Sequence, residues 1–304
     1  MKVVICYFSG TGNTAKVTHA YSDSLAERGA IVETYAMEDL LVNGLSDEFL
    51  NKLNDAELLG IAYPVHAFNA PSIVLKFVKS LPKATANKRA FIVSTSGEPL
   101  KLNNISSLKT QSLLKHRNYC MTNEYHYVMP YNIIFRHNDT MAYRMWELAQ
   151  KLIPLDVKDI LDGNEHKLDK VFCGGLVAWV MRCEHWGGRI NGKLYKVDNK
   201  CAHCQKCVSV CPTKNITAVD GKLKFGKNCL MCQRCINLCP KNAIKMGLFN
   251  KWKVNGAYSF VQPAEEQTQK YNKMLTKAYN EYFEENEKRI SPTEQSETNT
   301  KAAI

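Results

Sequence analysis

The chain has 304 residues, a hydrophobic content of 45% and a charged content of 23%, proportions typical of a globular protein that can bury a core without disulfides. Its longest uncharged apolar run, residues 171–181, is too short to span a bilayer, and the first apolar run breaks at Ser9-Gly10, before it could form a signal peptide. The net charge of +11 comes from residues 166–255, where 17 Lys and Arg accompany 4 Asp and Glu, and we expect a cytoplasmic protein whose clustered cysteines, eight of the twelve, serve metal or redox chemistry.

Residues 1–165 alternate β-rich apolar runs with helical patterns, which predicts a parallel α/β sheet. Strands are expected over residues 3–8, 31–35, 57–64, 89–97 and 124–130. Helices are expected over residues 14–28, 72–81, 105–117 and 140–152. This order fits the doubly wound, flavodoxin-like five-stranded parallel sheet, whose ligand lies beyond the carboxyl ends of the first and third strands. The loops that begin at Ser9 and Pro64 are therefore expected to meet at one site.

The loop S-G-T-G-N-T follows the first strand and opens the first helix. It lacks the third glycine of a dinucleotide-binding fingerprint, and hydroxyl and amide side chains stand in its place. Together with backbone amides at a helix N-terminus, these side chains are suited to enclose a terminal phosphate monoester. The alternative is a generic glycine-rich turn. The residues expected around the phosphate are Ser9, Gly10, Thr11, Gly12, Asn13 and Thr14.

Residues 1–160 resemble flavodoxin, and the glycine loop matches that family's FMN phosphate loop residue by residue. The resemblance implies FMN as cofactor, with Phe68 as the best candidate to stack on its ring and the loop 95–98 at the ring's pyrimidine edge. The residues implied around the ring are Pro64, Val65, His66, Ala67, Phe68, Asn69, Thr95, Ser96 and Gly97. Two departures from flavodoxins stand out. The second loop has no aromatic residue, so Tyr131 or the other domain would cover that face, and residues 64–71 carry no acid.

Residues 166–192 connect the two halves of the chain. Their apolar run, V-F-C-G-G-L-V-A-W-V-M, is expected to form a buried or domain-docking helix. A foot that touches a membrane is the alternative.

Residues 193–248 hold two copies of the pattern C-x2-C-x2-C-x3-C-P, each with similar residues before and after it. Three cysteines separated by two residues each can reach different irons of one [4Fe-4S] cube, and the fourth is carried by a helical turn to the other cluster. Zinc is the competing metal, although zinc sites usually pair two separated C-x2-C knuckles. The predicted ligands are Cys201, Cys204, Cys207 and Cys239 for the first cluster, and Cys229, Cys232, Cys235 and Cys211 for the second.

This repeat resembles the two-[4Fe-4S] bacterial ferredoxins, a small α+β fold. The two halves together resemble the flavodoxin–ferredoxin fusion proteins of anaerobic bacteria. The basic charge departs from free ferredoxins, which are typically acidic. It indicates a redox partner with an acidic docking surface, and no nucleic acid is expected because no basic-aromatic binding motif accompanies the charge.

Residues 249–290 are expected to form a helical extension, with a C-terminal helix that begins after Pro263. An apolar stripe at i, i+3, i+4 spacing is expected to pack on the rest of the protein, with a partner-docking helix as the alternative. The stripe consists of Tyr271, Met274, Leu275, Ala278, Tyr279, Tyr282 and Phe283. Residues 291–304 are polar and are expected to be disordered.

The expected function is electron transfer between FMN and two [4Fe-4S] clusters, as a low-potential shuttle between redox enzymes. FMN holds one or two electrons and each cluster holds one, so such a fusion can split or pool electrons. The alternative is a flavin-dependent reductase of a small acceptor, fed through its own clusters. No nicotinamide site is evident, and His66 is the only titratable candidate near the flavin loops.

Overall fold

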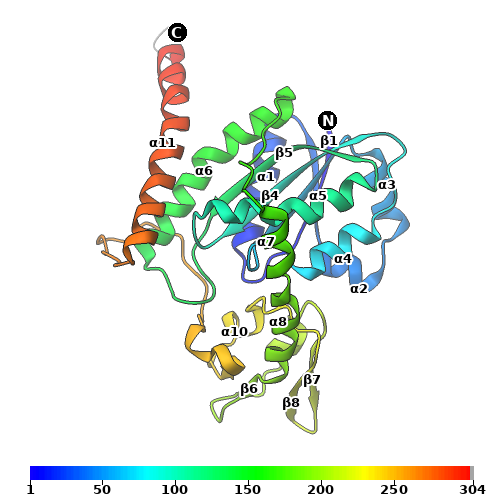
Figure 1. Cartoon of the computed structure of the whole chain (residues 1–304), viewed down its shortest axis with the longest axis vertical. Helices are drawn as coiled ribbons and strands as arrows, with labels where there is room; N and C mark the ends of the chain where they lie inside the picture. Colours follow the sequence, from blue (N-terminus) through cyan, green and yellow to red (C-terminus); the bar gives the residue numbers. More distant parts are fainter. Residues whose placement is uncertain (302–304) are drawn as a thin grey trace.

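The N-terminal half is a five-stranded parallel sheet in the order β2-β1-β3-β4-β5 (Figure 1). This computed structural model describes residues 1–301, with side chains as far as Ser291. The strands are β1 (Lys2–Tyr7), β2 (Ile31–Ala36), β3 (Leu58–Pro64), β4 (Lys88–Ser96) and β5 (Tyr119–Val128). The order is that of the doubly wound, flavodoxin-like sheet, so the predicted fold class is confirmed.

Helices cover both faces of the sheet, which is why its strands read as nearly continuous apolar runs. Val3 and Ile5 of β1 pack toward α1 (Asn13–Glu27) and α6 (Asp139–Asp162), whereas Val4 and Cys6 pack toward the opposite layer. That layer consists of α2 (Met37–Asn43), α3 (Asp47–Asp55), α4 (Ser72–Ser80), the 3₁₀ helix η1 (Lys101–Ser107) and α5 (Leu108–Lys115).

Helix α6 is longer than its sequence pattern predicts. The expected helix over residues 140–152 stops before Pro154, but α6 continues through that proline to Asp162. Ile153, Val157 and Ile160 are buried beyond the predicted end, so the apolar face carries the helix across the interruption.

A small second domain contains two antiparallel pairs, β6 with β9 and β7 with β8. Its elements are β6 (Lys196–Val197), α9 (Lys206–Ser209), β7 (Ile216–Val219), β8 (Lys222–Phe225), α10 (Arg234–Asn237) and β9 (Ile244–Lys245). The duplication seen in the sequence recurs in the backbone. Left-handed residues fall at matching positions of the two copies: His203 and Met231, Gln205 and Gln233, Lys214 and Asn242.

Helices α7 (Gly174–Met181) and α8 (Cys183–Lys193) run from the sheet domain to the small domain (Figure 1). The pair docks on both domains, as a domain-docking helix would, but it is not buried, because its large apolar side chains are exposed. Its inward positions are small instead: a Cβ added to Gly174 would lie 2.7 Å from Ile105, and one added to Gly192 would lie 2.1 Å from the Cβ of Cys229. Within residues 1–301, no helix has the length and apolar character needed to cross a membrane.

The C-terminal helix begins later than predicted. After the 3₁₀ helix η2 (Gly247–Trp252), the chain is irregular as far as α11 (Lys273–Lys301), so Pro263 does not open a helix. Gln267 and Gln269 instead hydrogen-bond to residues 136–140, and Asn272 caps α11 by accepting from the amide of Leu275 at 2.9 Å. The backbone of α11 is described as far as Lys301, whereas the side chains beyond Ser291 and all of residues 302–304 lie outside the described part. Disorder over residues 291–304 therefore stays a prediction.

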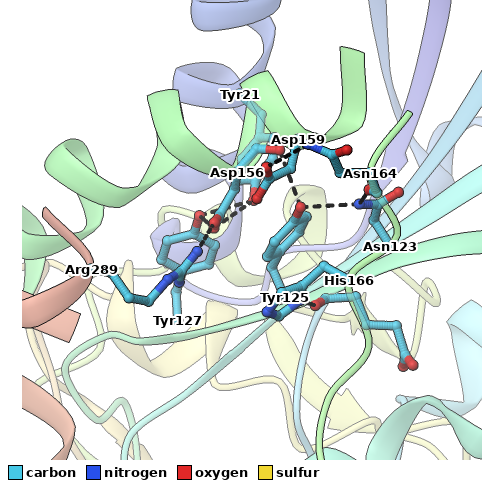
Figure 2. Close-up of polar contacts among 10 residues, drawn as sticks. Tyr21, Asn123, Tyr125, Tyr127, Asp156, Asp159, Asn164, His166 and Arg289 are labelled. Atoms are coloured by element: carbon cyan, nitrogen blue, oxygen red, sulfur yellow. Dashed lines mark hydrogen bonds and ion pairs between the residues drawn. The ribbon is translucent and has the colours of Figure 1, made fainter. Parts of the chain in front are cut away.

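Helix α11 packs on α6 and the edge of the sheet, as the predicted stripe requires. Tyr279 and Phe283 are buried there, whereas Met274 is exposed. Figure 2 shows the polar anchor of the same contact, in which Arg289 donates to the Asp156 carboxylate at 2.6 Å and Tyr21 and Tyr127 point at the same group. Burial raises the pKa of Asp156 above its ordinary value, although Arg289 and Tyr127 act in the opposite direction.

Candidate redox site between the two domains

The carboxyl ends of β1, β3 and β4 bring three predicted loops together. The amide of Phe8 donates to the Ala62 carbonyl at 2.9 Å, which places the glycine loop beside the end of β3. Pro64 pairs with Thr95 across β3 and β4, and the amide of Val65 donates to Thr95 at 2.7 Å. The three loops therefore form one edge of the sheet, where the doubly wound fold binds ligands.

The glycine loop turns sharply into helix α1. Gly12 has a φ of 109°, which favours glycine, and its amide donates to the Ser9 hydroxyl at 3.1 Å. Two of the predicted phosphate contacts are used to fix the loop: Asn13 Nδ2 donates to the Pro130 carbonyl at 2.7 Å, and the Thr14 and Thr95 hydroxyls lie 2.8 Å apart. Thr11 and the amides at the start of α1 remain to face an anion, and the Ser9 hydroxyl, which accepts from Gly12, keeps its own hydrogen to donate.

The loop after β3 is held in a tight turn. His66 and Asn69 exchange two backbone hydrogen bonds of 2.9 Å, and Asn69 Nδ2 donates to the Ala67 carbonyl at 3.1 Å. Ala67 and Phe68 both have positive φ, so Phe68 stands at the tip of a constrained turn. Burial, with a smaller contribution from His185, lowers the pKa of His66 to about 4, which leaves this imidazole neutral near pH 7.

The loop after β4 is covered by an aromatic side chain from elsewhere in the chain. A Cβ added to Gly97 would lie 2.3 Å from the ring of Tyr131, so only glycine fits beneath this ring. The Tyr279 hydroxyl of α11 donates to the Gly97 carbonyl at 2.6 Å. Burial raises the pKa of the neighbouring Glu98 carboxyl above its usual value, while Tyr131 and Asn103 lower it by smaller amounts.

The small domain docks directly on the glycine loop. Arg234 donates to the carbonyls of Ser9 at 2.5 Å and Gly10 at 3.2 Å, and it forms a 2.5 Å ion pair with Glu38. Its side chain and that of Glu38 are only 17% and 12% exposed. A Cβ added to Gly10 would lie 2.3 Å from the Cys232 carbonyl oxygen, so Gly10 permits close approach of the two backbones.

The eight repeated cysteines line two separate cavities. One cavity is lined by Cys211, Cys229, Cys232 and Cys235, and the other by Cys201, Cys204, Cys207 and Cys239. Each cavity thus takes three cysteines from one copy of the pattern and the fourth from the other copy. Over the described residues, no three Cys, His, Asp or Glu side chains are arranged to hold a single metal ion.

Backbone amides point at the sulfur atoms in the same way in both copies. The amide of His203 donates to Cys201 Sγ and that of Met231 to Cys229 Sγ, both at 3.4 Å. The amides of Asn215 and Ala243, each three residues after a proline, donate to the fourth cysteines, Cys211 and Cys239, at 3.3 Å. Amide donors of this kind stabilise thiolate sulfur and tune the potential of an iron–sulfur cluster.

The two cavities differ in depth. Burial raises the pKa of Cys229 to about 12 and that of Cys232 to about 11, so these thiols would ionise only on binding a metal. Leu230 and Cys232 also pack against the apolar layer of the sheet domain. In the other cavity, Cys204 is exposed. One cavity therefore lies against the glycine loop, and the other opens toward the surface.

Helix α8 contributes polar residues that the sequence patterns did not single out. Its Glu184 and His185 lie 3.9 Å apart, are largely buried, and have ring and carboxylate atoms without a partner among the described residues. His185 faces the backbone of Ala70 and perturbs the pKa of His66, so this pair lies beside the loop after β3. Burial raises the pKa of Glu184 to about 7. The only feature of the sequence that could have indicated this pair is an acid and a histidine about one helical turn before Gly188. Gly188 itself packs beside Met231.

Residues 188–286 match the family model described as a 4Fe-4S dicluster domain, which identifies this part of the chain as an iron–sulfur domain. No curated protein sequence matches the chain.

Flavodoxin-like solved structures are similar to the N-terminal half. Rubredoxin oxygen:oxidoreductase from Desulfovibrio gigas is 16% identical, with a TM-score of 0.37, over 53% of this chain and 36% of that one. The chain thus spans about a third of that oxidoreductase. A short-chain flavodoxin associated with a non-canonical PDU bacterial microcompartment is 13% identical, with a TM-score of 0.39, over 54% and 99%. The flavodoxin of Megasphaera elsdenii is 17% identical, with a TM-score of 0.37, over 51% and 98%.

The strand order β2-β1-β3-β4-β5 is that of a flavodoxin-like sheet. A flavodoxin-like sheet joined to a 4Fe-4S dicluster domain is the architecture of a flavodoxin–ferredoxin fusion, and it supports an electron-transfer role.

Proposed function

We propose that this protein relays electrons between an FMN on the sheet domain and two [4Fe-4S] clusters in the small domain, as a cytoplasmic low-potential shuttle between redox enzymes. The observation that carries the proposal is the contact between the Cys232 backbone and Gly10. Arg234, two residues after Cys232, binds the carbonyls of the same glycine loop. Cofactors held by these two loops would be neighbours.

The residues at the sheet edge fit FMN. The Ser9 and Thr11 hydroxyls and the first amides of α1 would hold the phosphate, and the His66–Asn69 turn and Gly97 would hold the ring. Bound FMN would supply a centre that exchanges one or two electrons. Tyr131, on Gly97, would cover the face for which the second loop lacks an aromatic residue of its own.

The two cysteine cavities fit cubane clusters with crossed ligation. Cys201, Cys204, Cys207 and Cys239 would hold the first cluster, and Cys229, Cys232, Cys235 and Cys211 the second. A single zinc ion would require four sulfur atoms at about 2.3 Å from one point, whereas among the described residues no three such side chains are arranged around a single ion. The grouping of the fourth cysteines follows the pattern of two-cluster ferredoxins.

The difference in depth between the two cavities supports one spatial order of the three cofactors. The second cluster would lie between the flavin and the first cluster, which would be nearest to solvent at the exposed Cys204. Lys206 and Lys241 line the cavity at that end, so an acidic redox protein is the partner that charge would steer there. We divide the chain accordingly into an FMN domain (1–165), a connector (166–192), a cluster domain (193–248) and a C-terminal extension (249–290).

A second candidate function is reduction of a small acceptor at the flavin. The observation that favours it is the buried Glu184 and His185 pair beside the flavin loop, because a reductase needs proton donors near the ring. Anaerobic consumption of NADH or of a small acceptor by the purified protein alone would distinguish a reductase from a carrier.

The proposal is tested by the composition of protein produced anaerobically. We expect one FMN, about eight irons and about eight acid-labile sulfides per chain. Cys211→Ser should damage the cluster of Cys229, Cys232 and Cys235, and Cys173→Ser, at an exposed cysteine outside the pattern, should change neither cluster. Tightly bound zinc in the wild-type protein would contradict the cluster assignment, and damage confined to the first cluster in Cys211→Ser would contradict crossed ligation.

A further inference from the structure

Helices α7 and α8 expose the residues that a helix ordinarily buries. Gly174, Ala178, Gly188 and Gly192 face the protein, whereas the large apolar side chains face outward. Trp179 and Trp186 are 66% and 68% exposed, and Phe172, just before α7, is 93% exposed. We call this surface the α7–α8 face; it consists of Phe172, Leu176, Trp179, Val180, Trp186, Ile190 and Leu194.

The exposed residues form one stripe along both helices. Trp179 and Trp186 are seven residues apart, and Leu176, Val180, Ile190 and Leu194 recur at spacings that keep them on the same side. Leu248 and Trp252 are exposed on η2, which packs beside α8. Three of the four tryptophans are therefore exposed in this region, while Trp146 is buried in the sheet domain. A continuous apolar stripe of this extent marks an interaction surface.

The charges around the stripe are almost all positive. Residues 170–197 contain five basic residues, Lys170, Arg182, Arg189, Lys193 and Lys196, and a single acid, Glu184, whose side chain is largely buried. The Arg189 guanidinium lies 5.4 Å from the Trp186 ring centroid, so charge and aromatic surface adjoin. Lys251 adds a further cation beside Trp252.

We propose that the α7–α8 face binds the surface of an anionic lipid bilayer. A helix with one apolar face and basic flanks lies in the plane of the interface, with its apolar side chains among the acyl chains and its cations at the headgroups. Tryptophan is enriched at that depth because its ring is amphipathic. The outward stripe, the exposed indoles and the cationic flanks are the three features that such a surface recognises.

Other occupants match these features less well. A second copy of the chain would bring the same apolar stripe but would also oppose Arg189 and Lys193 to identical cations. A protein partner would need a long apolar groove with acidic rims, since the exposed side chains lie along two consecutive helices that run from one domain to the other (Figure 1). A bilayer offers apolar depth and negative charge along the whole length of both helices.

Attachment through this face would place the redox site close to the membrane. The opposite side of α8 touches Met231 and Cys229 through Gly188 and Gly192. One helix diameter, about 10 Å, therefore separates the proposed bilayer surface from that cysteine loop. The surface proposal rests on side-chain exposure and charge, and it stands whether or not the electron relay is correct.

Vesicle flotation of the full-length protein, loaded with its cofactors, tests the proposal. We expect the wild type to float with phosphatidylcholine vesicles that contain about 30% phosphatidylglycerol, to bind pure phosphatidylcholine weakly, and to release as salt rises. Trp179→Glu with Trp186→Glu should lower the partition coefficient by roughly tenfold or more, since both indoles would leave the interface. Met274→Glu, at an exposed apolar residue of α11, is the matched control and should bind as the wild type does.

Circular dichroism and iron content establish that each variant is folded. Arg189→Gln with Lys193→Gln should weaken binding to anionic vesicles only, and tryptophan emission of the wild type should shift to the blue on binding. Wild-type protein that fails to float, or a double tryptophan variant that floats as well as wild type, overturns the proposal. If the wild type does not bind vesicles but forms a dimer that the two tryptophan changes dissociate, the face belongs to a second copy of the chain. If the wild type does not bind vesicles but binds an acidic protein saturably at this face, the face belongs to that partner.

Discussion

Arg234 is the main polar contact between the glycine loop and the second cysteine motif, and its removal should separate the two proposed cofactors. Arg234→Ala removes the donors to the Ser9 and Gly10 carbonyls and the ion pair to Glu38. The second oxygen of Glu38 has no hydrogen-bond partner within the described part of the chain, so the change leaves a largely buried carboxylate without its cation.

Removing one partner of a buried ion pair costs about 3–5 kcal/mol, because the remaining charge is neither solvated nor paired. Each 1.4 kcal/mol is a factor of ten, so the ratio of docked to undocked domains should fall by roughly 100-fold or more. Glu38→Gln in the Arg234→Ala background should recover part of this loss, since it removes the stranded charge.

Hydrogen exchange at the amides of residues 10–14 and 230–236 measures the docking equilibrium, and transient reduction of the flavin measures electron transfer to the clusters. Both regions should exchange faster in Arg234→Ala, and transfer should slow. Arg117→Ala is the control, since Arg117 also donates to backbone carbonyls but within the sheet domain. Unchanged exchange and unchanged transfer in Arg234→Ala would refute the claim that this contact couples the two sites.

Three further changes probe single groups. In Glu184→Gln, the loss of stability between pH 5 and pH 8 should be smaller than in wild type. The pKa of Glu184 is about 7 in the folded protein against the ordinary 4.5, so its protonated form contributes about 3 kcal/mol to the free energy of unfolding below pH 4.5, and this contribution is lost as the pH rises through 7. Wild type and variant that lose stability equally with pH would contradict this. Arg289→Ala should lower the free energy of unfolding by about 3–5 kcal/mol by stranding Asp156, whereas Arg144→Ala, in the exposed pair with Glu287 on the same two helices, should cost about 1 kcal/mol; equal losses would show that burial of the pair does not matter. Thr11→Leu should lose FMN and keep its iron, and wild-type flavin affinity in this variant would place the phosphate elsewhere.

The sheet could be predicted from the sequence because its strands are short apolar runs separated by helical periodicity. The glycine loop and the loop at Pro64 then follow from strand order alone, since parallel strands end at one edge. The cysteine spacing predicted crossed sets of ligands, and the cavities group the same residues, but ligation itself stays a prediction.

The contact between Arg234 and Glu38 could not be predicted, because 196 residues separate the pair and no local pattern records it. The orientation of α7 and α8 was also missed. Apolar periodicity shows that a face exists, but Gly174 and Gly192 let the opposite face approach Ile105 and Cys229, which turned the large side chains outward. The late start of α11 has a similar cause, since Gln267 and Gln269 bind the 136–140 loop instead of continuing a helix.

The central claim is that one chain passes electrons between a flavin and two clusters. The most direct measurement is flash reduction of the flavin in protein produced anaerobically, followed by the absorbance of the clusters at several protein concentrations. Transfer within the chain predicts that flavin oxidation and cluster reduction share one first-order rate that does not depend on protein concentration. Clusters that stay oxidised, or a rate proportional to protein concentration, would contradict the account.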